Sequence, residues 1–584
     1  MQITREWPKT IFSLTKRGLS SAFLASALLV NAEAAPQIKT LPTIDPDKSL
    51  TGWILASNVM MQRGHIDAAY NALNRILALS GNNLTYHEQT LHYALMSGHE
   101  EEALQLAKTL PNHDIATFIL VQNAASHKNW DEMRHLLNHN SHHGMLISTA
   151  QPVFLAWALA EEGHIQQALD TLHSASSFAG TRRLYQLHAA LISERLPDDS
   201  QAKALYQKVG SSPDDPLLLQ ILYTQAYSSW LETKHQHQAA IDCITALGVN
   251  SPLASLTIGP LQHNLKSRPP LSSNQGLAIL DFQIALMLND VIQQEGLQRD
   301  PAIITLKQAL YFDPSLTVAR IFLADIFRDN QQITEGLEEL SHIPNTDPLA
   351  ALAAQERVNL ASSSHDLNRE AQALYQALEI LPDNPDFLTQ LAEVEDELGH
   401  HNEAIVLFTS AIKASPPRKE ALWPLLLGRA MAEEELGNWI NTRADMHRAL
   451  ELAPNQPEVL NFVGYGNIEH NEDQENAISL LKRALQLEPN NPSIQDSYAW
   501  ALLKHTGDLK TSLPILIQAA EHSSSDPEIG YHLGVAYWYL GRQTEAKDQW
   551  NQSLDDHPLP QDKALLLNAL QQNGPHLPIF ETKK

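Results

Sequence analysis

Residues 526–558 carry a pattern that restricts strongly how this chain can fold. Pro527 predicts the start of a helix, because a proline at the first helical position loses no backbone hydrogen bond. Gly541 predicts the end of that helix, since glycine readily adopts the left-handed conformation found there. Ala546 and Trp550 recur four residues apart, which predicts a second helix after the turn. One such hairpin cannot bury its own apolar face, so the rest of the chain must supply neighbours.

The markers of this hairpin recur along the chain at nearly constant spacing. Gly64 and Gly98 are 34 residues apart, and so are Ala69 and Ala103. We therefore predict an all-α chain in which helical hairpins stack into a solenoid. Four alanines that close later second helices follow at intervals of 38, 35 and 35 residues: Ala411, Ala449, Ala484 and Ala519.

Composition and periodicity divide the chain into successive regions. Residues 251–275 contain Pro252, Pro260, Pro269 and Pro270 and no sustained periodicity, which predicts a long connection between two arms. We predict these regions: a signal peptide at 1–34, a degenerate arm at 35–250, the proline-rich connection at 251–275, central repeats at 276–382, a well-formed array at 383–558, and a capping helix with a tail at 559–584.

The N-terminus has the layout of a secretory signal peptide. Basic residues up to Arg17 precede an apolar run at 19–30, and Ala32 and Ala34 form a small-x-small cleavage site. This predicts export to the periplasm, where the chain would be soluble or peripheral at the outer membrane. An uncleaved N-terminal anchor is the alternative. From residue 35 onward no run of 18 apolar residues occurs, so we expect no transmembrane span in the mature chain.

The charge balance favours some partners and excludes others. The chain has 40 Lys and Arg against 67 Asp and Glu, a net charge of −27. Such a surface repels phosphate backbones, so nucleic acid is not an expected partner. Basic or neutral partners are favoured. Cys243 is the single cysteine, so no intramolecular disulfide can form.

No sequence pattern predicts catalysis, a cofactor or a metal site. The chain has no Gly-rich phosphate loop, no Gly-x-Ser-x-Gly elbow, no His-Glu-x-x-His and no Cys-x-x-Cys. His135 and His139 lie four apart and precede His142 and His143, which is a spacing that can share a metal. No carboxylate or thiolate accompanies them, so a solvated helix end is the preferred interpretation. We therefore expect a protein that is not an enzyme.

The order Leu533-Gly534, Tyr537, Gly541-Arg542, Ala546 and Pro558 resembles the tetratricopeptide repeat. The resemblance covers essentially the whole mature chain and is strongest at 383–558. The layout, with closing motifs such as Asn461-Phe-Val-Gly-Tyr465, is also similar to long exported tetratricopeptide proteins of Gram-negative, particularly alphaproteobacterial, envelopes. The resemblance implies a right-handed superhelix whose first helices line a concave wall that takes a peptide or partner helix.

Residues on that wall are the candidate partner-binding site. The family's best-known ligand mode clamps a terminal carboxylate with Lys and Arg, but the matching positions here are acidic or aromatic. We therefore expect a basic or aromatic-rich segment of a protein partner; the alternative is that the aromatic residues pack against the tail at 559–584. The candidates are Tyr531, Val535, Trp538, Asn461, Tyr465, Glu434, Glu393 and Asp396.

Three functions remain open from the sequence, the least favoured of which is an accessory subunit of an enzyme with no site of its own. The first is a non-enzymatic scaffold or adaptor that binds proteins in a periplasmic envelope assembly. The second is a factor that associates with envelope polysaccharide or peptidoglycan during export or assembly. These first two would use the same acidic and aromatic wall.

Overall fold

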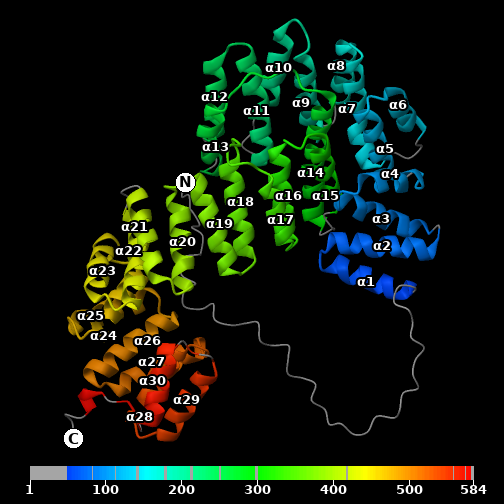
Figure 1. Cartoon of the computed structure of the whole chain (residues 1–584). Helices are drawn as coiled ribbons and strands as arrows, with labels where there is room; N and C mark the ends of the chain where they lie inside the picture. The colour runs from blue at the N-terminus through cyan, green and yellow to red at the C-terminus, as the bar shows by residue number, and fades with distance from the viewer. Residues whose placement is uncertain are drawn as a thin grey trace, which may run out of the picture. The chain divides into compact units, whose positions relative to one another are not determined.

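The structure is a computed structural model, and it describes residues 49–580 with short gaps at 82, 112, 140–143, 177–179, 211–214, 249–251, 296–299, 416–418, 557, 559, 573 and 576. The described residues form α-helices with short turns and no strand, as the sequence predicts (Figure 1). Among them, no helix combines the length and the apolar character needed to cross a membrane. The predicted signal peptide at 1–34 lies outside the described residues.

The chain divides into two compact units between Leu381 and Pro382. We call the described residues before this point the N-terminal unit and those after it the C-terminal unit. The helices of the N-terminal unit are α1 Leu50–Gln62, α2 Ile66–Ser80, α3 Leu84–Met96, α4 Glu100–Lys108, α5 Asp114–Ser126, α6 Trp130–His139, α7 Met145–Glu161, α8 Ile165–Ala175, α9 Arg182–Ser193, α10 Asp199–Val209, α11 Leu217–Thr233, α12 His237–Leu247, α13 Pro252–His263, α14 Ser273–Glu295, α15 Asp300–Phe312, α16 Thr317–Asp329, α17 Ile333–Ser341, α18 Ala350–Ser363 and α19 Leu367–Ile380.

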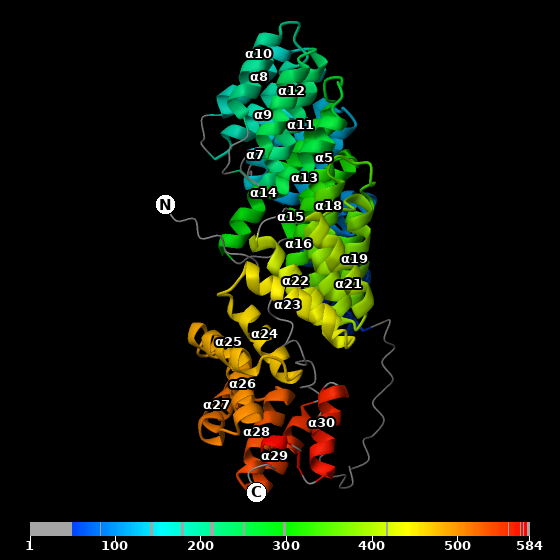
Figure 2. The same ribbon diagram turned by 90° about the vertical axis from the view of Figure 1, so that its left-hand side faces the viewer.

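The C-terminal unit continues the same hairpins and ends in an additional helix. Its helices are α20 Pro385–Glu397, α21 His401–Ala414, α22 Lys419–Glu435, α23 Trp439–Leu452, α24 Pro457–Glu469, α25 Gln474–Leu487, α26 Pro492–Ala501 with the π-helical turn η2 Leu502–Thr506, α27 Leu509–His522, α28 Pro527–Tyr539, α29 Gln543–Asp555, α30 Pro560–Gln571 and the short turn η3 Pro578–Phe580. Figure 2 shows this succession from a second direction.

The predicted connection at 251–275 is wrong in two respects. Most of it is helical, because α13 covers Pro252–His263 and α14 begins at Ser273. It also lies within the N-terminal unit and does not mark the boundary between the units. Pro252 fits the first turn of α13, where proline costs no hydrogen bond, and the helix also contains Pro260. Its apolar residues Ala254 and Leu261 are buried. The prediction weighed the number of prolines and overlooked this apolar side of the helix.

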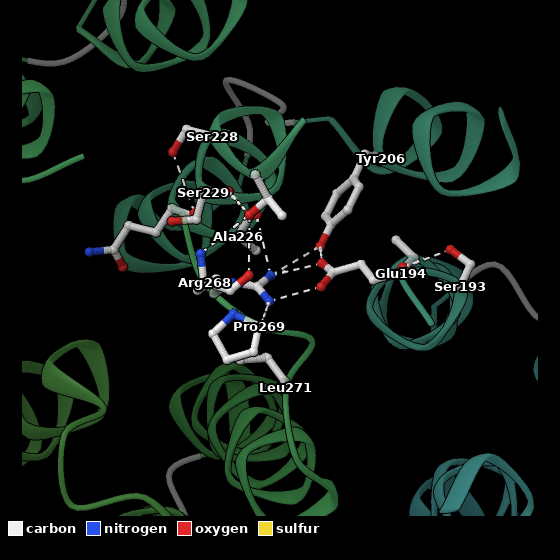
Figure 3. A network of polar contacts seen from close by, with 12 residues as sticks. Ser193, Glu194, Tyr206, Ala226, Ser228, Ser229, Arg268, Pro269 and Leu271 are labelled. Carbon is white, nitrogen blue, oxygen red and sulfur yellow. Dashed lines mark hydrogen bonds and ion pairs between the residues drawn. The ribbon is translucent and has the colours of Figure 1, made fainter. Parts of the chain in front are cut away.

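The extended residues that remain, 264–272, are tied to the helices by a buried network (Figure 3). The guanidinium of Arg268 donates two hydrogen bonds of 2.8 Å to the carboxylate of Glu194, which also accepts from the hydroxyl of Tyr206. The Glu194 side chain is only 4% exposed. The Thr233 hydroxyl donates to the carbonyl of Arg268 at 3.1 Å. Because Arg268 and Glu194 compensate each other's charge, the segment is held without leaving an unpaired buried ion.

The N-terminal unit is closed by contacts between distant parts of the chain. Helix α14 packs against α5, α7 and α9, and α15 packs against α3. The Gln122 amide donates to the buried carboxylate of Asp281 at 2.6 Å, and the Gln332 amide donates to the carbonyl of Gly64 at 2.8 Å. The second half of this unit therefore covers helices of the first half that an open solenoid would leave free.

The turn between the two helices of a hairpin contains a left-handed residue in most hairpins of the described chain; the turn between α9 and α10 is an exception. Well-formed hairpins place a glycine with positive φ there, as at Gly64 (71°) and Gly541 (78°). Degenerate hairpins keep the left-handed conformation without the glycine, as at His235 (57°) and His365 (55°). A left-handed conformation costs a non-glycine residue about 1–2 kcal/mol, so stacking of the hairpins, and not the local sequence, maintains these turns.

We expect His365→Gly to raise the free energy of unfolding of the N-terminal unit by about 0.5–1 kcal/mol. Glycine relieves the left-handed strain, and its extra freedom in the unfolded chain offsets part of the gain. Asn368→Gly, inside the first turn of α19, is the matched control and should destabilise the unit. Urea unfolding of the three proteins measures both effects. A destabilising His365→Gly would show that the histidine side chain itself holds the turn.

The hairpin at 526–558 forms as its sequence predicts. Helix α28 begins at Pro527, and the side chain of Asp526 accepts hydrogen bonds from the two following backbone amides at 3.1 and 3.3 Å. A Cβ atom at Gly534 would lie 2.1 Å from the Trp550 ring, so only glycine permits this approach of α28 and α29. Beyond it, Leu566 and Ala569 of α30 are buried in the same core and cap the array.

Candidate functional site

The first helices of the C-terminal unit form a curved face. The hydroxyl of Tyr465 on α24 donates a hydrogen bond to the carboxylate of Glu528 on α28, across the intervening helix α26. Side chains of α24 and α28 can meet across α26 only if the row of first helices is curved, with these side chains on its concave side. We call this surface the inner face and define it by these residues: Glu393, Asp396, Glu434, Asn461, Tyr465, Glu469, Asp496, Trp500, Lys504, Glu528, Tyr531 and His532.

Carboxylates of the inner face are held by donors from neighbouring helices. Asp396 accepts from the Nδ1 atom of His401 at 2.7 Å. Glu434 contacts the Nε2 atom of His470 at 2.8 Å. Glu469 accepts from the Trp500 indole at 2.7 Å and from the Lys504 ammonium at 2.8 Å. Lys504 is the permanently charged donor among these partners, so the inner face keeps an excess of negative charge.

The centre of the inner face is a buried pair. The Nδ1 atom of His532 lies 2.8 Å from a carboxylate oxygen of Asp496, and their side chains are 3% and 5% exposed. The Trp500 ring stacks on the His532 ring at 3.9 Å and meets Tyr531 edge to face at 6.2 Å. Burial alone would lower the pKa of His532, but Asp496 outweighs it and raises the pKa above the usual value. The pair is therefore favoured in its charged form.

The Glu528 side chain is exposed to water, although the neighbouring protein removes part of its hydration. The pKa of Glu528 is raised to about 7, mainly by loss of hydration and also by the negative charges of Asp496 and Asp526, while His532 and the Tyr465 hydroxyl oppose the shift. Burial also raises the pKa of Asp396 and of Asp562 on α30, with Glu435 adding repulsion in both cases. Burial and neighbouring negative charges thus make ionisation of these three carboxylates less favourable. A bound cation would lower the free energy of their ionised forms.

The stability of the C-terminal unit should therefore depend on pH through Glu528. Its pKa is higher in the folded state than the usual 4.5, so the folded state binds the proton more tightly. This stabilising contribution is present near pH 5 and is lost as the pH rises through 7. Because water screens the site, we expect about 1 kcal/mol rather than the full value of the shift.

Urea unfolding of the wild type and of Glu528→Gln at pH 5 and pH 8 tests this expectation. The amide cannot titrate, so the variant should lose less stability between the two pH values than the wild type does. His532 changes stability in the same direction, and because the charge of Glu528 helps to raise the pKa of His532, its contribution should also diminish in the variant. Equal pH dependence of the two proteins would contradict the assignment.

Three acceptor oxygens on the inner face have no donor. The Oε2 atom of Glu434, the Oδ1 atom of Asn461 and the Oδ1 atom of Asp496 are buried and have no hydrogen-bond partner among the described residues. A buried acceptor without a donor costs about 1–3 kcal/mol, and native structures rarely leave several together. The inner face is therefore short of donors as well as of positive charge.

Some predicted site residues lie elsewhere. Val535 is fully buried, so it belongs to the core and cannot contact a partner. It lies on the side of α28 that packs against neighbouring helices. Trp538 lies against the tail, since a Cβ atom at Gly574 would come within 2.0 Å of its ring, and the neighbouring Tyr539 donates to the carbonyl of Pro575 at 2.7 Å. For Trp538, the structure agrees with the alternative of packing against the tail. Glu393 lies half-buried on α20.

Several residues of the inner face were missed at the level of sequence. Asp496 and Trp500 lie 35 residues after Asn461 and Tyr465, so the repeat period pointed to them. Glu528 stands two residues after the Asp526 cap, where an acidic residue is also explained by the helix dipole, so its role was not visible.

In the described part of the chain, no group of three or more His, Cys, Asp or Glu residues is placed to hold a metal ion. His142 and His143, the end of the histidine run considered above, lie outside the described residues. Burial raises the pKa of the Cys243 thiol to about 11, which suits a structural cysteine better than a nucleophile.

No protein-family model matches the sequence, and no curated protein matches it. Solved structures with similar folds include YrrB, a TPR protein with an unusual peptide-binding site, which is 17% identical, covers 34% of this chain and 99% of its own, and has a TM-score of 0.25. The APC/C hetero-tetramer Cut9–Hcn1 is 14% identical, covers 89% of this chain and 96% of its own, and has a TM-score of 0.34. Yeast Tom70 is 13% identical, covers 91% and 97%, and has a TM-score of 0.28. Identities and TM-scores this low carry no argument about function. The stacked hairpins, their left-handed turns and their regular spacing make this chain an all-α solenoid of the tetratricopeptide type.

Proposed function

We propose that this protein is a non-enzymatic adaptor whose C-terminal unit binds a basic segment of a partner protein on its inner face. The observation that carries the proposal is the shortage of donors there: three buried acceptors are unpaired, and carboxylates outnumber cations. Lysine and arginine side chains supply both the donors and the charge that this surface lacks. Tyr531 is half-buried on the same face and offers an aromatic contact beside them.

The signal-like N-terminus supports a place for this adaptor outside the cytoplasm, in the periplasm. Binding to envelope polysaccharide is the less favoured function. Sugar rings stack on open aromatic faces, whereas Trp500 is 4% exposed, Trp538 lies against the tail, and Tyr539 stacks on Phe580 at 4.1 Å. These three rings are therefore engaged within the protein and are not open to a sugar ring.

Calorimetric titration of the full chain with a peptide that alternates lysine and tyrosine tests the proposal. Glu434→Gln with Glu469→Gln removes two negative charges from the inner face and should weaken binding at least tenfold, an effect that rising salt diminishes. Glu451→Gln with Glu545→Gln is the matched control, because these exposed carboxylates lie on the second helices α23 and α29.

The control should bind within twofold of the wild type, and both variants should unfold at nearly the same temperature. Equal weakening by the two pairs would mean that the peptide responds to net charge alone and would contradict the proposal. Retention of the wild type on envelope polysaccharide, with no binding to the peptide, would favour the second function.

A further inference from the structure

The N-terminal unit contains a cavity that is lined by arginines, whereas the inner face of the C-terminal unit carries mainly carboxylates. It has a volume of about 510 Å³ and lies among α17, the turn that follows it, α18 and α19. Arg357 and Arg369 line it together with Asn345, Gln372 and Gln376, and one carboxylate residue, Glu379, also lines it. It is built mainly by second helices, whereas the inner face is built by first helices. Its volume falls within the usual range of ligand pockets, about 300–1,000 Å³.

The two arginines differ from the other partly buried arginines of this unit. Among the described residues, those others each form an ion pair with a carboxylate: Arg134, Arg183, Arg195, Arg268, Arg320 and Arg328. Arg357 donates only to the backbone carbonyl of Leu340, at 3.1 Å, and the side chain of Arg369 has no partner in the described structure. The chain has 67 acidic residues against 40 basic ones. A shortage of carboxylates in the sequence therefore does not explain why these two arginines form no ion pair.

An unpaired guanidinium that is partly withdrawn from water is costly, and burial lowers the pKa of Arg357 accordingly. A carboxylate can accept two parallel hydrogen bonds from a guanidinium and would offset that cost. The amides of Asn345, Gln372 and Gln376 can donate to and accept from a peptide backbone, and Leu337 and Ile343 add apolar contact. The lining therefore fits an extended peptide better than a small anion, which would use the arginines alone.

We propose that this cavity binds an acidic segment of a protein partner, with a Glu or Asp carboxylate seated on Arg357 and Arg369. This site has the opposite charge preference to the inner face of the C-terminal unit. The chain would then join an acidic partner to a basic one, each held by its own unit. The two sites are separate in the chain, so either could exist without the other.

Calorimetric titration of the full chain with an acetylated and amidated octapeptide that alternates glutamate and leucine tests the site. Arg369→Gln should weaken binding at least tenfold, because it removes one half of the carboxylate contact. Arg448→Gln removes the same charge from an exposed pair on α23 and should leave the affinity within twofold. Glu379→Gln should bind the peptide two- to threefold more tightly, since a repelling charge in the lining is lost.

Arg369 lies near the surface, so its replacement should leave the thermal unfolding unchanged even if Arg357→Gln fails to fold. The proposal is overturned if the wild type does not bind the peptide or if Arg369→Gln and Arg448→Gln weaken it equally. It is also overturned if inorganic phosphate at 10-fold excess over the peptide, at constant ionic strength, displaces it completely. Arg369→Gln should not change the affinity for the lysine–tyrosine peptide, which separates this site from the inner face.

Discussion

Replacing Arg268 with alanine should lower the free energy of unfolding of the N-terminal unit by about 3–5 kcal/mol. The variant would leave the Glu194 carboxylate, whose side chain is 4% exposed, without its two hydrogen bonds from the guanidinium. A buried charge without compensation is among the most destabilising changes a single substitution can make. The Tyr206 hydroxyl still donates to Glu194 but cannot neutralise it.

Urea unfolding of three further proteins shows whether charge is the cause. Arg268→Met with Glu194→Met removes both ions and should recover most of the loss, because a buried ion pair and an apolar pair are often nearly equal in stability. Arg448→Ala breaks an exposed pair, with side chains 59% and 66% exposed, and should cost less than about 1 kcal/mol. If the double variant is no more stable than Arg268→Ala, the extended segment at 264–272 depends on the shape of Arg268 and not on its charge.

Replacing His532 with alanine should destabilise the C-terminal unit by about 3 kcal/mol at neutral pH. Asp496 would lose its histidine partner at 2.8 Å, and its other carboxylate oxygen already lacks a donor. The stacking of His532 with Trp500 would be lost as well. His505→Ala is the matched control, because this histidine lies 3.9 Å from the exposed Glu475 and should contribute little.

Thermal unfolding followed by circular dichroism measures both histidine variants. His532→Ala with Asp496→Ala should be more stable than His532→Ala alone, since the orphaned carboxylate is removed. If the double variant is no more stable than His532→Ala, the loss comes from packing against Trp500 and not from the unpaired carboxylate.

The sequence was sufficient for the fold because the markers of the hairpin act locally. Pro527, Gly541 and the contact of Gly534 with Trp550 each restrict one helix end or one helix crossing, and each is found where the pattern predicts. The same reasoning gave a wrong prediction at 251–275, because the number of prolines was considered and their positions within helix α13 were not. Pro252 stands in a first turn, and Ala254 and Leu261 supply the buried side of a helix.

The candidate site was only partly predictable, because it depends on contacts between hairpins. Tyr465 and Glu434 were identified from their repeat positions, but their partners Glu528 and His470 lie 63 and 36 residues away. The cavity of Arg357 and Arg369 had no sequence signal at all. An arginine without a carboxylate partner becomes visible only when every neighbouring side chain is placed.

The long-range closure of the N-terminal unit has a consequence for how the chain folds. Its contacts join residues 159 and 268 positions apart, at Gln122 with Asp281 and at Gln332 with Gly64. Those contacts cannot form until the chain has been synthesised at least as far as Gln332, and closing such loops is slow. The C-terminal unit joins residues one or two repeats apart, as at Trp500 with Glu469 (31 positions) and Tyr465 with Glu528 (63 positions). It can therefore assemble hairpin by hairpin. The two units should refold at different rates, with the N-terminal unit as the slower, all-or-none step.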